Sequence, residues 1–286
     1  MSAKAGSAAQ QLRRLALGDG SVIAYREEGA GAPLLLLHGI TEDHRAWDEI
    51  APLLARDARV IRVDLPGHGA SSPLPEYSAF TLGTAVANFV RALALPEPPR
   101  VVGHSLGGLL ATLLGALVPV RSILNVDQPL LLGSFIERVR RIAPRLAGAG
   151  FCEAMNEEME LLGGPRLPGP VRDELRRYRV EARAPVVRGL WLPLLAQDEA
   201  AVLATLTPVL SQISAPYLSL HGDDPGAGYA KWLRGAIPGA QTEVWPGLGH
   251  WLHRVDPARF AARLRTFHSN ASKHPGTFHD EIARAD

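Results

Sequence analysis

The chain has 286 residues, and its 30 Lys and Arg residues nearly balance its 29 Asp and Glu residues, giving a formal net charge of +1. That balance argues against nucleic-acid binding, which needs an excess or a concentrated stripe of positive charge. Hydrophobic residues make up 47% of the chain and charged residues 21%, which is typical of globular proteins and excludes a disordered chain. The single cysteine, Cys152, cannot form an internal disulfide, so disulfide scaffolds and cysteine-based zinc sites are excluded.

The start of the chain does not resemble a secretory signal, because residues 1–11 are small and polar and two arginines follow them. The uncharged stretch at residues 101–120 is long enough to cross a bilayer. However, His104, Ser105 and four glycines interrupt it, which favours a buried strand followed by a buried helix. We therefore expect a cytoplasmic protein that does not insert into membranes.

The first half of the chain alternates predicted strands with predicted helices. It opens with a hairpin around Gly18-Asp19-Gly20. Strands are then predicted at residues 33–37, 59–63, 101–102 and 123–126, and helices at 43–56, 79–95 and 106–117. The run at 33–37 is apolar throughout, which is typical of a strand buried on both faces of a parallel sheet.

The pattern changes at residues 130–205, where no strand is predicted and Arg, Glu and Leu recur at helical spacings. Strands at 217–220 and 242–245 and helices at 228–237 and 257–267 follow. This alternation predicts a doubly wound parallel sheet, an α/β fold with helices on both faces. The inserted helical block should cap the carboxyl ends of the strands, where ligands bind in such sheets. The predicted domains are a core at residues 1–129 and 206–268, a cap at 130–205 and a flexible C-terminal tail at 269–286.

Residues 103–107, Gly-His-Ser-Leu-Gly, match the pattern G-x-S-x-G between a predicted strand and a predicted helix. This context is the one that a nucleophile elbow requires. A sharp turn from strand to helix exposes the hydroxyl of Ser105, and the flanking glycines leave room for closely packed backbone. The N-terminal end of the helix also favours a developing oxyanion. The motif therefore predicts Ser105 as a nucleophile.

Four segments together resemble the α/β-hydrolase family over roughly residues 12–268. They are His38-Gly39, Asp-Leu-Pro-Gly-His-Gly-Ala-Ser at 64–71, Gly-His-Ser-Leu-Gly-Gly at 103–108 and Gly-His-Trp-Leu-His at 249–253. The resemblance implies a mostly parallel eight-stranded sheet with an inserted helical cap, and a serine hydrolase similar to esterases and lactonases. Such an enzyme needs no cofactor. A metal site is further disfavoured, because no His, Asp and Glu residues have the spacing of ligands in the sequence.

A serine hydroxyl needs a base to take its proton. In this family the nucleophile, the acid and the histidine follow in that order along the chain. His250 resembles the catalytic histidine of the family by its position. The acid is left open among three residues. Asp224, which precedes a proline in the loop after residues 217–220, is preferred; its neighbour Asp223 and Asp127, at the end of another predicted strand, are the alternatives.

The resemblance assigns the oxyanion hole to the backbone N–H groups of Ile40 and Leu106. Residues 64–69 are interpreted as a rigid turn near the site that takes no part in the chemistry. Five side chains are candidates for the substrate pocket: His104, Met155, Met159, Trp191 and Trp251. They would form an apolar and adaptable wall, although ordinary packing is the alternative for each cap residue.

We therefore expect a serine hydrolase that cleaves a small-to-medium carboxylic ester, lactone or thioester through an acyl-enzyme on Ser105. The same three residues could instead support hydrolysis of a carbon–carbon bond, cofactor-free peroxidation or a lyase reaction. A ligand-binding protein without catalytic activity is a further alternative, because a fold does not determine a function. The expected partner is a small-molecule substrate, and no oligomeric state is predicted.

Overall fold

The computed structural model describes residues 11–163, 166–180 and 184–273. Its strands are β1 (Arg13–Ala16), β2 (Val22–Glu28), β3 (Pro33–Leu37), β4 (Arg59–Val63), β5 (Arg100–His104), β6 (Ser122–Val126), β7 (Tyr217–His221) and β8 (Gln241–Val244). They form one sheet in the order β1-β2-β4-β3-β5-β6-β7-β8. The pairs β1–β2 and β2–β4 are antiparallel, and the other neighbours are parallel. The predicted doubly wound, mostly parallel sheet of eight strands is therefore confirmed.

Strand β3 shows why an uninterrupted apolar run predicts a central strand. All five of its residues are buried, and it pairs with β4 on one side and β5 on the other. Successive side chains of a strand point to opposite faces of the sheet. Leu35 and Leu37 therefore join the hydrophobic core on one face, and Leu34 and Leu36 join the core on the other.

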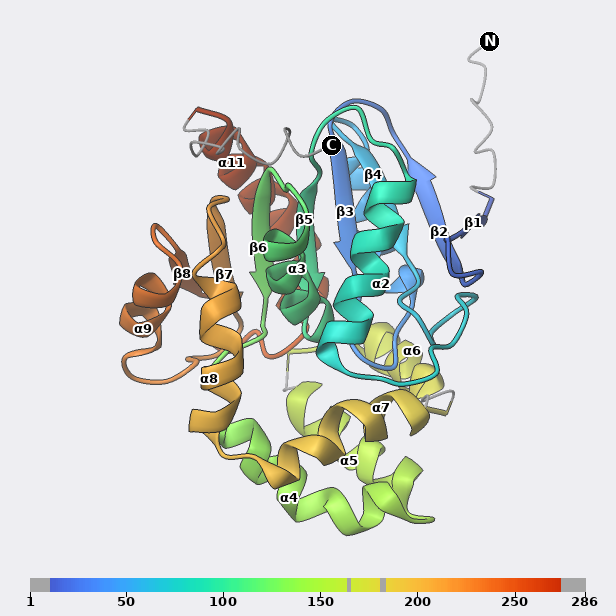
Figure 1. Ribbon diagram of the computed structural model, residues 1–286, viewed down its shortest axis with the longest axis vertical. Coiled ribbons are helices and arrows are strands. Elements are labelled where there is room, and N and C mark those ends of the chain that lie inside the picture. Colours follow the sequence, from blue (N-terminus) through green and yellow to red (C-terminus); the bar gives the residue numbers. More distant parts are fainter. Residues whose placement is uncertain (1–10, 164–165, 181–183, 274–286) are drawn as a thin grey trace.

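Helices cover both faces of the sheet (Figure 1). One face carries α2 (Ala79–Ala92), α3 (Leu106–Leu117), α8 (Glu199–Leu210) and α9 (Tyr229–Ala236). The other carries η1 (His44–Trp47), α1 (Ala51–Leu54), α10 (Leu252–Val255) and α11 (Pro257–Lys273). The single helix predicted at residues 43–56 is wrong, because the segment forms the short elements η1 and α1. Pro52 has no N–H group with which to continue a helix from η1 into α1.

Further helices lie between β6 and β7 in the chain: α4 (Gly133–Ala147), α5 (Phe151–Gly163), α6 (Gly169–Val180), α7 (Ala184–Trp191) and η2 (Leu192–Ala196). Helices α4 to α7 gather beyond the carboxyl ends of the parallel strands, where the cap was expected (Figure 1). Helix α8, which begins inside the predicted cap range, instead packs Leu206 and Leu210 into the core beside α3. The division into core and cap stays a prediction.

The C-terminal helix is longer than the sequence pattern predicts. Helix α11 continues through Lys273, past the predicted start of the tail at residue 269. Residues 274–286 of that tail, and residues 1–10 at the other end, lie outside the described part of the chain. The uncharged stretch at 101–120 forms most of β5 and all of α3. Among the described residues, no helix combines the length and the apolar character that crossing a bilayer requires.

Candidate active site

Ser105 lies in the turn between β5 and α3 and has φ 52° and ψ −121°. A residue other than glycine in such a conformation costs about 1–3 kcal/mol, and it persists only where the surrounding structure holds it. Here the N–H of Ser105 donates to the carbonyl of Val126 at 2.9 Å, and its own carbonyl accepts from the N–H of Gly108 at 2.7 Å. The strained turn that the G-x-S-x-G pattern requires is therefore present in the backbone.

The glycines of this turn allow the backbone to pack closely. A Cβ atom at Gly103 would lie 1.8 Å from the carbonyl oxygen of Gly107, and a Cβ at Gly107 would lie 2.2 Å from that of Leu37. We expect Gly103→Ala to lower the free energy of unfolding by at least about 3 kcal/mol, because a backbone carbonyl cannot rotate away as a side chain can. Urea unfolding would measure the difference.

Gly235→Ala is the matched control, because nothing lies within 4 Å of a Cβ at this helical position. Alanine there should leave stability unchanged or raise it by up to about 1 kcal/mol. Equal stabilities of the Gly103→Ala variant and the wild type would contradict the close packing of the turn.

His250 is paired with Asp127, the residue that directly follows β6. The Nδ1 atom of His250 lies 2.6 Å from Oδ2 of Asp127, whose Oδ1 accepts the N–H of Gly222 at 2.8 Å. Burial alone would raise the pKa of Asp127, but the hydrogen bond and charge of His250 and the N–H of Gly222 outweigh it and lower this pKa. Because the ionised carboxylate accepts the proton of Nδ1, the lone pair of His250 is on Nε2, as a general base requires.

The pairing of His250 with Asp127 contradicts the preference for Asp224 as the partner of this histidine. Oδ1 of Asp224 accepts the N–H of Gly226 at 2.9 Å in an exposed turn, and Asp223 beside it is also exposed. Both residues line the cavity, but neither has a hydrogen bond to His250 in the described structure. Strands β6 and β7 are parallel neighbours and end at the same edge of the sheet, so a carboxylate after either strand can approach this histidine.

The two proposed oxyanion donors, Ile40 and Leu106, are both buried and both line the cavity. Leu106 is the first residue of α3, where N–H groups have no partner within the helix. The peptide group between Gly39 and Ile40 carries the N–H of Ile40 and the carbonyl of Gly39. This carbonyl accepts a hydrogen bond from Nδ1 of His38 at 2.7 Å. Since a peptide is planar, holding the carbonyl of Gly39 also orients the N–H of Ile40.

A cavity of about 830 Å³ is lined by Ser105, His250 and Asp127 together. Four of the five predicted pocket side chains, His104, Met159, Trp191 and Trp251, line it. Met155 does not, and its prediction is wrong: it is fully buried in the hydrophobic core. Met155 and Met159 are one turn apart on the same face of α5, and both belong to the hydrophobic core, but only Met159 also reaches the cavity.

Sequence patterns do not identify most of the cavity wall, in which leucine is the commonest residue. These leucines come from the core helices and from the segments between β6 and β7. Examples are Leu109, Leu131, Leu161, Leu190, Leu194 and Leu206. Arg138 also lines the cavity, and Glu158 balances its charge at 2.9 Å from Nε. Leucine is common in any core, so no signal in the sequence distinguishes these residues.

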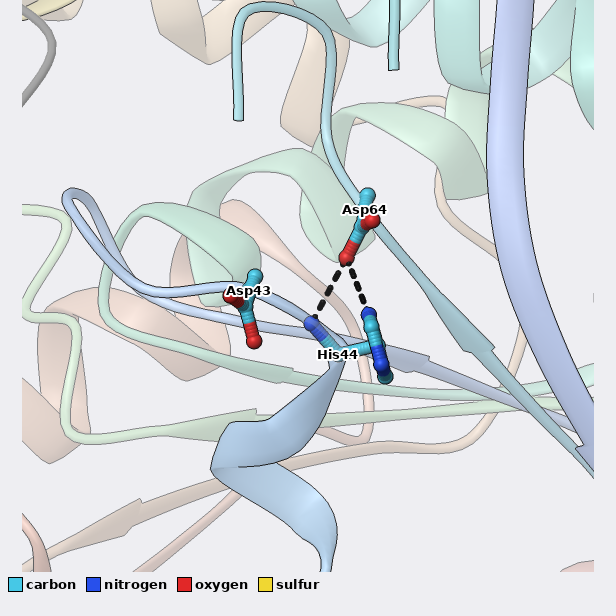
Figure 2. Close-up of side chains that lie close together, drawn as sticks. All are labelled: Asp43, His44 and Asp64. Atoms are coloured by element: carbon cyan, nitrogen blue, oxygen red, sulfur yellow. Dashed lines mark hydrogen bonds and ion pairs between the residues drawn. The ribbon is translucent and has the colours of Figure 1, made fainter. Parts of the chain in front are cut away.

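Asp43, His44 and Asp64 come together at the carboxyl end of β4, although their spacing in the sequence does not indicate it (Figure 2). Their possible ligand atoms lie within 4.8 Å of one another. Oδ1 of Asp64 accepts from the backbone N–H of His44 at 2.8 Å and from its Nδ1 at 2.6 Å, and Oδ2 accepts the N–H of Ala70 at 2.9 Å. The carboxylate of Asp43 accepts from Arg45.

The carboxylate oxygens of this group accept hydrogen bonds, and Nδ1 of His44 donates to Asp64, so the three residues form a hydrogen-bonded cluster. The cluster ties the segment around Asp43 and His44 to the turn after β4, in agreement with the interpretation of residues 64–69 as a rigid turn.

Comparisons with known proteins give the family. A model of the alpha/beta hydrolase family matches residues 34–263. A pimeloyl-[acyl-carrier protein] methyl ester esterase of Nitrosomonas europaea is 28% identical over 253 residues, which are 82% of this chain and 94% of the relative. The enzyme of the same name from Aeromonas hydrophila is 32% identical over 216 residues, 70% of this chain and 80% of the relative. An esterase from Rhodococcus sp., whose crystal structure is known, is 27% identical in sequence. Its structure superimposes on this one with a TM-score of 0.73, covering 91% of this chain and 99% of that one. The family model spans most of the sequence, and the chain belongs to the alpha/beta hydrolase family, as the resemblance predicts.

Proposed function

We propose that this protein is a serine esterase that cleaves a small-to-medium carboxylic ester, lactone or thioester through an acyl-enzyme. One observation carries the proposal. Ser105, in a strained turn, and His250, with Nδ1 2.6 Å from Asp127, line the same cavity of about 830 Å³. A nucleophile, a base and an orienting acid around one cavity are the groups that acyl transfer requires.

In the proposed reaction, the hydroxyl oxygen of Ser105 attacks the carbonyl carbon of the substrate while Nε2 of His250 takes the hydroxyl proton. Asp127 stabilises the resulting imidazolium. The carbonyl electrons move to the oxygen, which accepts hydrogen bonds from the N–H groups of Ile40 and Leu106. When the carbonyl re-forms, the bond to the leaving alcohol or thiol breaks and His250 protonates that group. Water then repeats the sequence on the acyl-enzyme and releases the acid.

The cavity supports a substrate with an apolar portion. Its volume lies within the usual range of small-molecule pockets, about 300–1,000 Å³. Its wall is rich in leucine, and the guanidinium of Arg138 is paired with Glu158. Two relatives are named as esterases of a methyl ester, that of pimeloyl-[acyl-carrier protein], so methyl esters of carboxylic acids are suitable first substrates.

A series of nitrophenyl esters with acyl chains of increasing length tests this proposal. We expect kcat/KM to rise by up to about fourfold for each methylene group that the cavity buries, because each contributes about 0.8 kcal/mol. The rise should stop when the chain fills the cavity. A fluorophosphonate should label Ser105 and abolish the activity, with the labelled residue identified by mass spectrometry.

The outcomes separate the alternatives. A protein that neither hydrolyses any ester nor reacts with the fluorophosphonate is not a serine esterase. Labelling of Ser105 without ester hydrolysis would instead favour carbon–carbon bond hydrolysis or a lyase reaction, for which a panel of keto acids is the next assay. The cytoplasmic location and the lack of a nucleic-acid or membrane partner stay predictions.

A further inference from the structure

A buried carboxylate, that of Glu42, lies where three segments of the site meet. The residue is only 3% exposed. Its Oε2 accepts the N–H of Gly39 at 2.9 Å and lies 3.2 Å from Nδ1 of His104. Its Oε1 accepts the indole N–H of Trp251 at 3.0 Å. A single side chain thus joins the loop after β3, the end of β5 and the segment that leads into α10.

Each of these contacts is one residue away from a group that the proposed mechanism uses. Gly39 precedes the donor Ile40, His104 precedes Ser105, and Trp251 follows His250. Gly39 packs closely against the carboxylate and the ring of His104. A Cβ at Gly39 would lie 2.6 Å from Oε2 of Glu42 and 3.0 Å from Nδ1 of His104. The position of Glu42 therefore determines how these neighbouring segments lie relative to one another.

The hydrogen bonds of His104 determine how many protons its ring carries. Nδ1 faces the carboxylate of Glu42, and Nε2 lies 2.9 Å from the carbonyl oxygen of His250. A carbonyl oxygen and an ionised carboxylate both act only as acceptors. An imidazole that faces an acceptor at each nitrogen satisfies both of them only by donating from both, as an imidazolium does.

The carboxylate is suited to its ionised form, because it also accepts two further N–H groups. Burial alone would raise the pKa of Glu42, but the hydrogen bond and charge of His104, together with the charge of Arg254, lower this pKa well below its ordinary value. If the carboxylate of Glu42 is ionised, the proton of its hydrogen bond with His104 resides on Nδ1 of the histidine.

Other titratable groups surround the pair. The pKa of His104 is lowered, because burial and the charge of His250 outweigh the hydrogen bond and charge of Glu42 and the charge of Asp127. What favours the imidazolium is the geometry, with an acceptor at each ring nitrogen. His253, whose ring lies 4.4 Å from that of His104, is kept neutral because burial holds its pKa well below the ordinary value. The nearest compensation for a charge on His104 is therefore the carboxylate of Glu42. A buried charge that loses its partner is strongly destabilised.

We infer that Glu42 and His104 form a carboxylate–imidazolium pair that positions the oxyanion loop, the nucleophile turn and His250 relative to one another. The inference rests on the function proposed above. Glu42 also lines the cavity, but its hydrogen bonds go to Gly39, His104 and Trp251, and we assign it the role of a positioning residue that acts through these neighbours.

Kinetics of E42Q, H104Q and the double variant test the pair. We expect E42Q to lower kcat by about 10- to 100-fold, less than the 10²–10³-fold loss from removing an oxyanion donor outright. KM should change less than about threefold, since the leucines and most of the other residues that line the cavity are unaltered. The double variant should be about as active as the less active of the two single variants, because the effects of changing two residues that act as a unit do not add.

E243Q is the matched control, because Oε1 of Glu243 on β8 also accepts an indole N–H, that of Trp245, at 2.7 Å. It should keep the kcat of the wild type. Thermal unfolding shows whether each variant is folded. An unchanged kcat in folded E42Q, or losses in E42Q and H104Q that simply add in the double variant, would overturn the inference.

NMR of protein labelled with ¹⁵N-histidine tests the pair without any substrate. At neutral pH, both ring nitrogens of His104 should carry a hydrogen in the wild type and only one in E42Q. A His104 ring with a single hydrogen in the wild type overturns the inference, even if no variant folds. Failure of the fluorophosphonate to label Ser105 would refute the proposed function and leave this result standing, so the two failures are distinguishable.

Discussion

Ser105→Ala should lower kcat/KM for ester hydrolysis by about 10⁴- to 10⁶-fold, because without the hydroxyl no acyl-enzyme forms. A small residual rate above that of water is expected, since the backbone N–H groups of Ile40 and Leu106 remain in place. Substrate binding should change little, because the leucine-rich wall of the cavity is unaltered. Steady-state kinetics on the best ester of the chain-length series would measure the effect.

The matched control is Ser211→Ala, at an exposed serine whose hydroxyl donates to the carbonyl of Pro208 at 2.9 Å. This variant should retain the wild-type rate and the wild-type reaction with the fluorophosphonate. If Ser105→Ala hydrolysed esters at the wild-type rate, another residue would be the nucleophile and the proposed mechanism would be wrong.

Asp127→Asn should lower kcat by about 10⁴-fold, the loss typical of an acid–histidine pair in which the acid becomes an amide. Asp127 accepts the Nδ1 proton of His250 at 2.6 Å. An asparagine amide can instead donate to Nδ1, which moves the ring proton to Nε2. The histidine then has no lone pair with which to accept the proton of Ser105. Steady-state kinetics with the same ester would measure this loss.

Asp224→Asn distinguishes the two carboxylates, because its side chain keeps the oxygen that accepts the N–H of Gly226. We expect its kcat to lie within about twofold of the wild type, since an exposed turn contributes little to the chemistry. Asp223→Asn, the adjacent exposed residue, should behave in the same way. A larger loss of kcat in Asp224→Asn than in Asp127→Asn would show that the catalytic acid is Asp224, in the loop after β7.

The sequence by itself determined the features that depend on local pattern. The apolar run at residues 33–37 predicts a central strand, because a strand buried on both faces needs apolar side chains at every position. The G-x-S-x-G pattern between a strand and a helix predicts the turn at Ser105. Glycines are required there, because a Cβ at Gly103 or Gly107 would lie only 1.8 Å or 2.2 Å from a backbone oxygen. Four such motifs in the right order were enough to identify the family.

Only the tertiary structure decided which groups lie side by side. Asp127 and Asp224 both follow strands that end at the same edge of the sheet, and the path of each loop places only Asp127 against His250. The sequence did not single out Glu42 at all, because its partners Gly39, His104 and Trp251 come from three separate segments. Periodicity and motifs report on neighbours along the chain, whereas hydrogen bonds in a site depend on positions accurate to a fraction of an ångström, which only the packed fold defines.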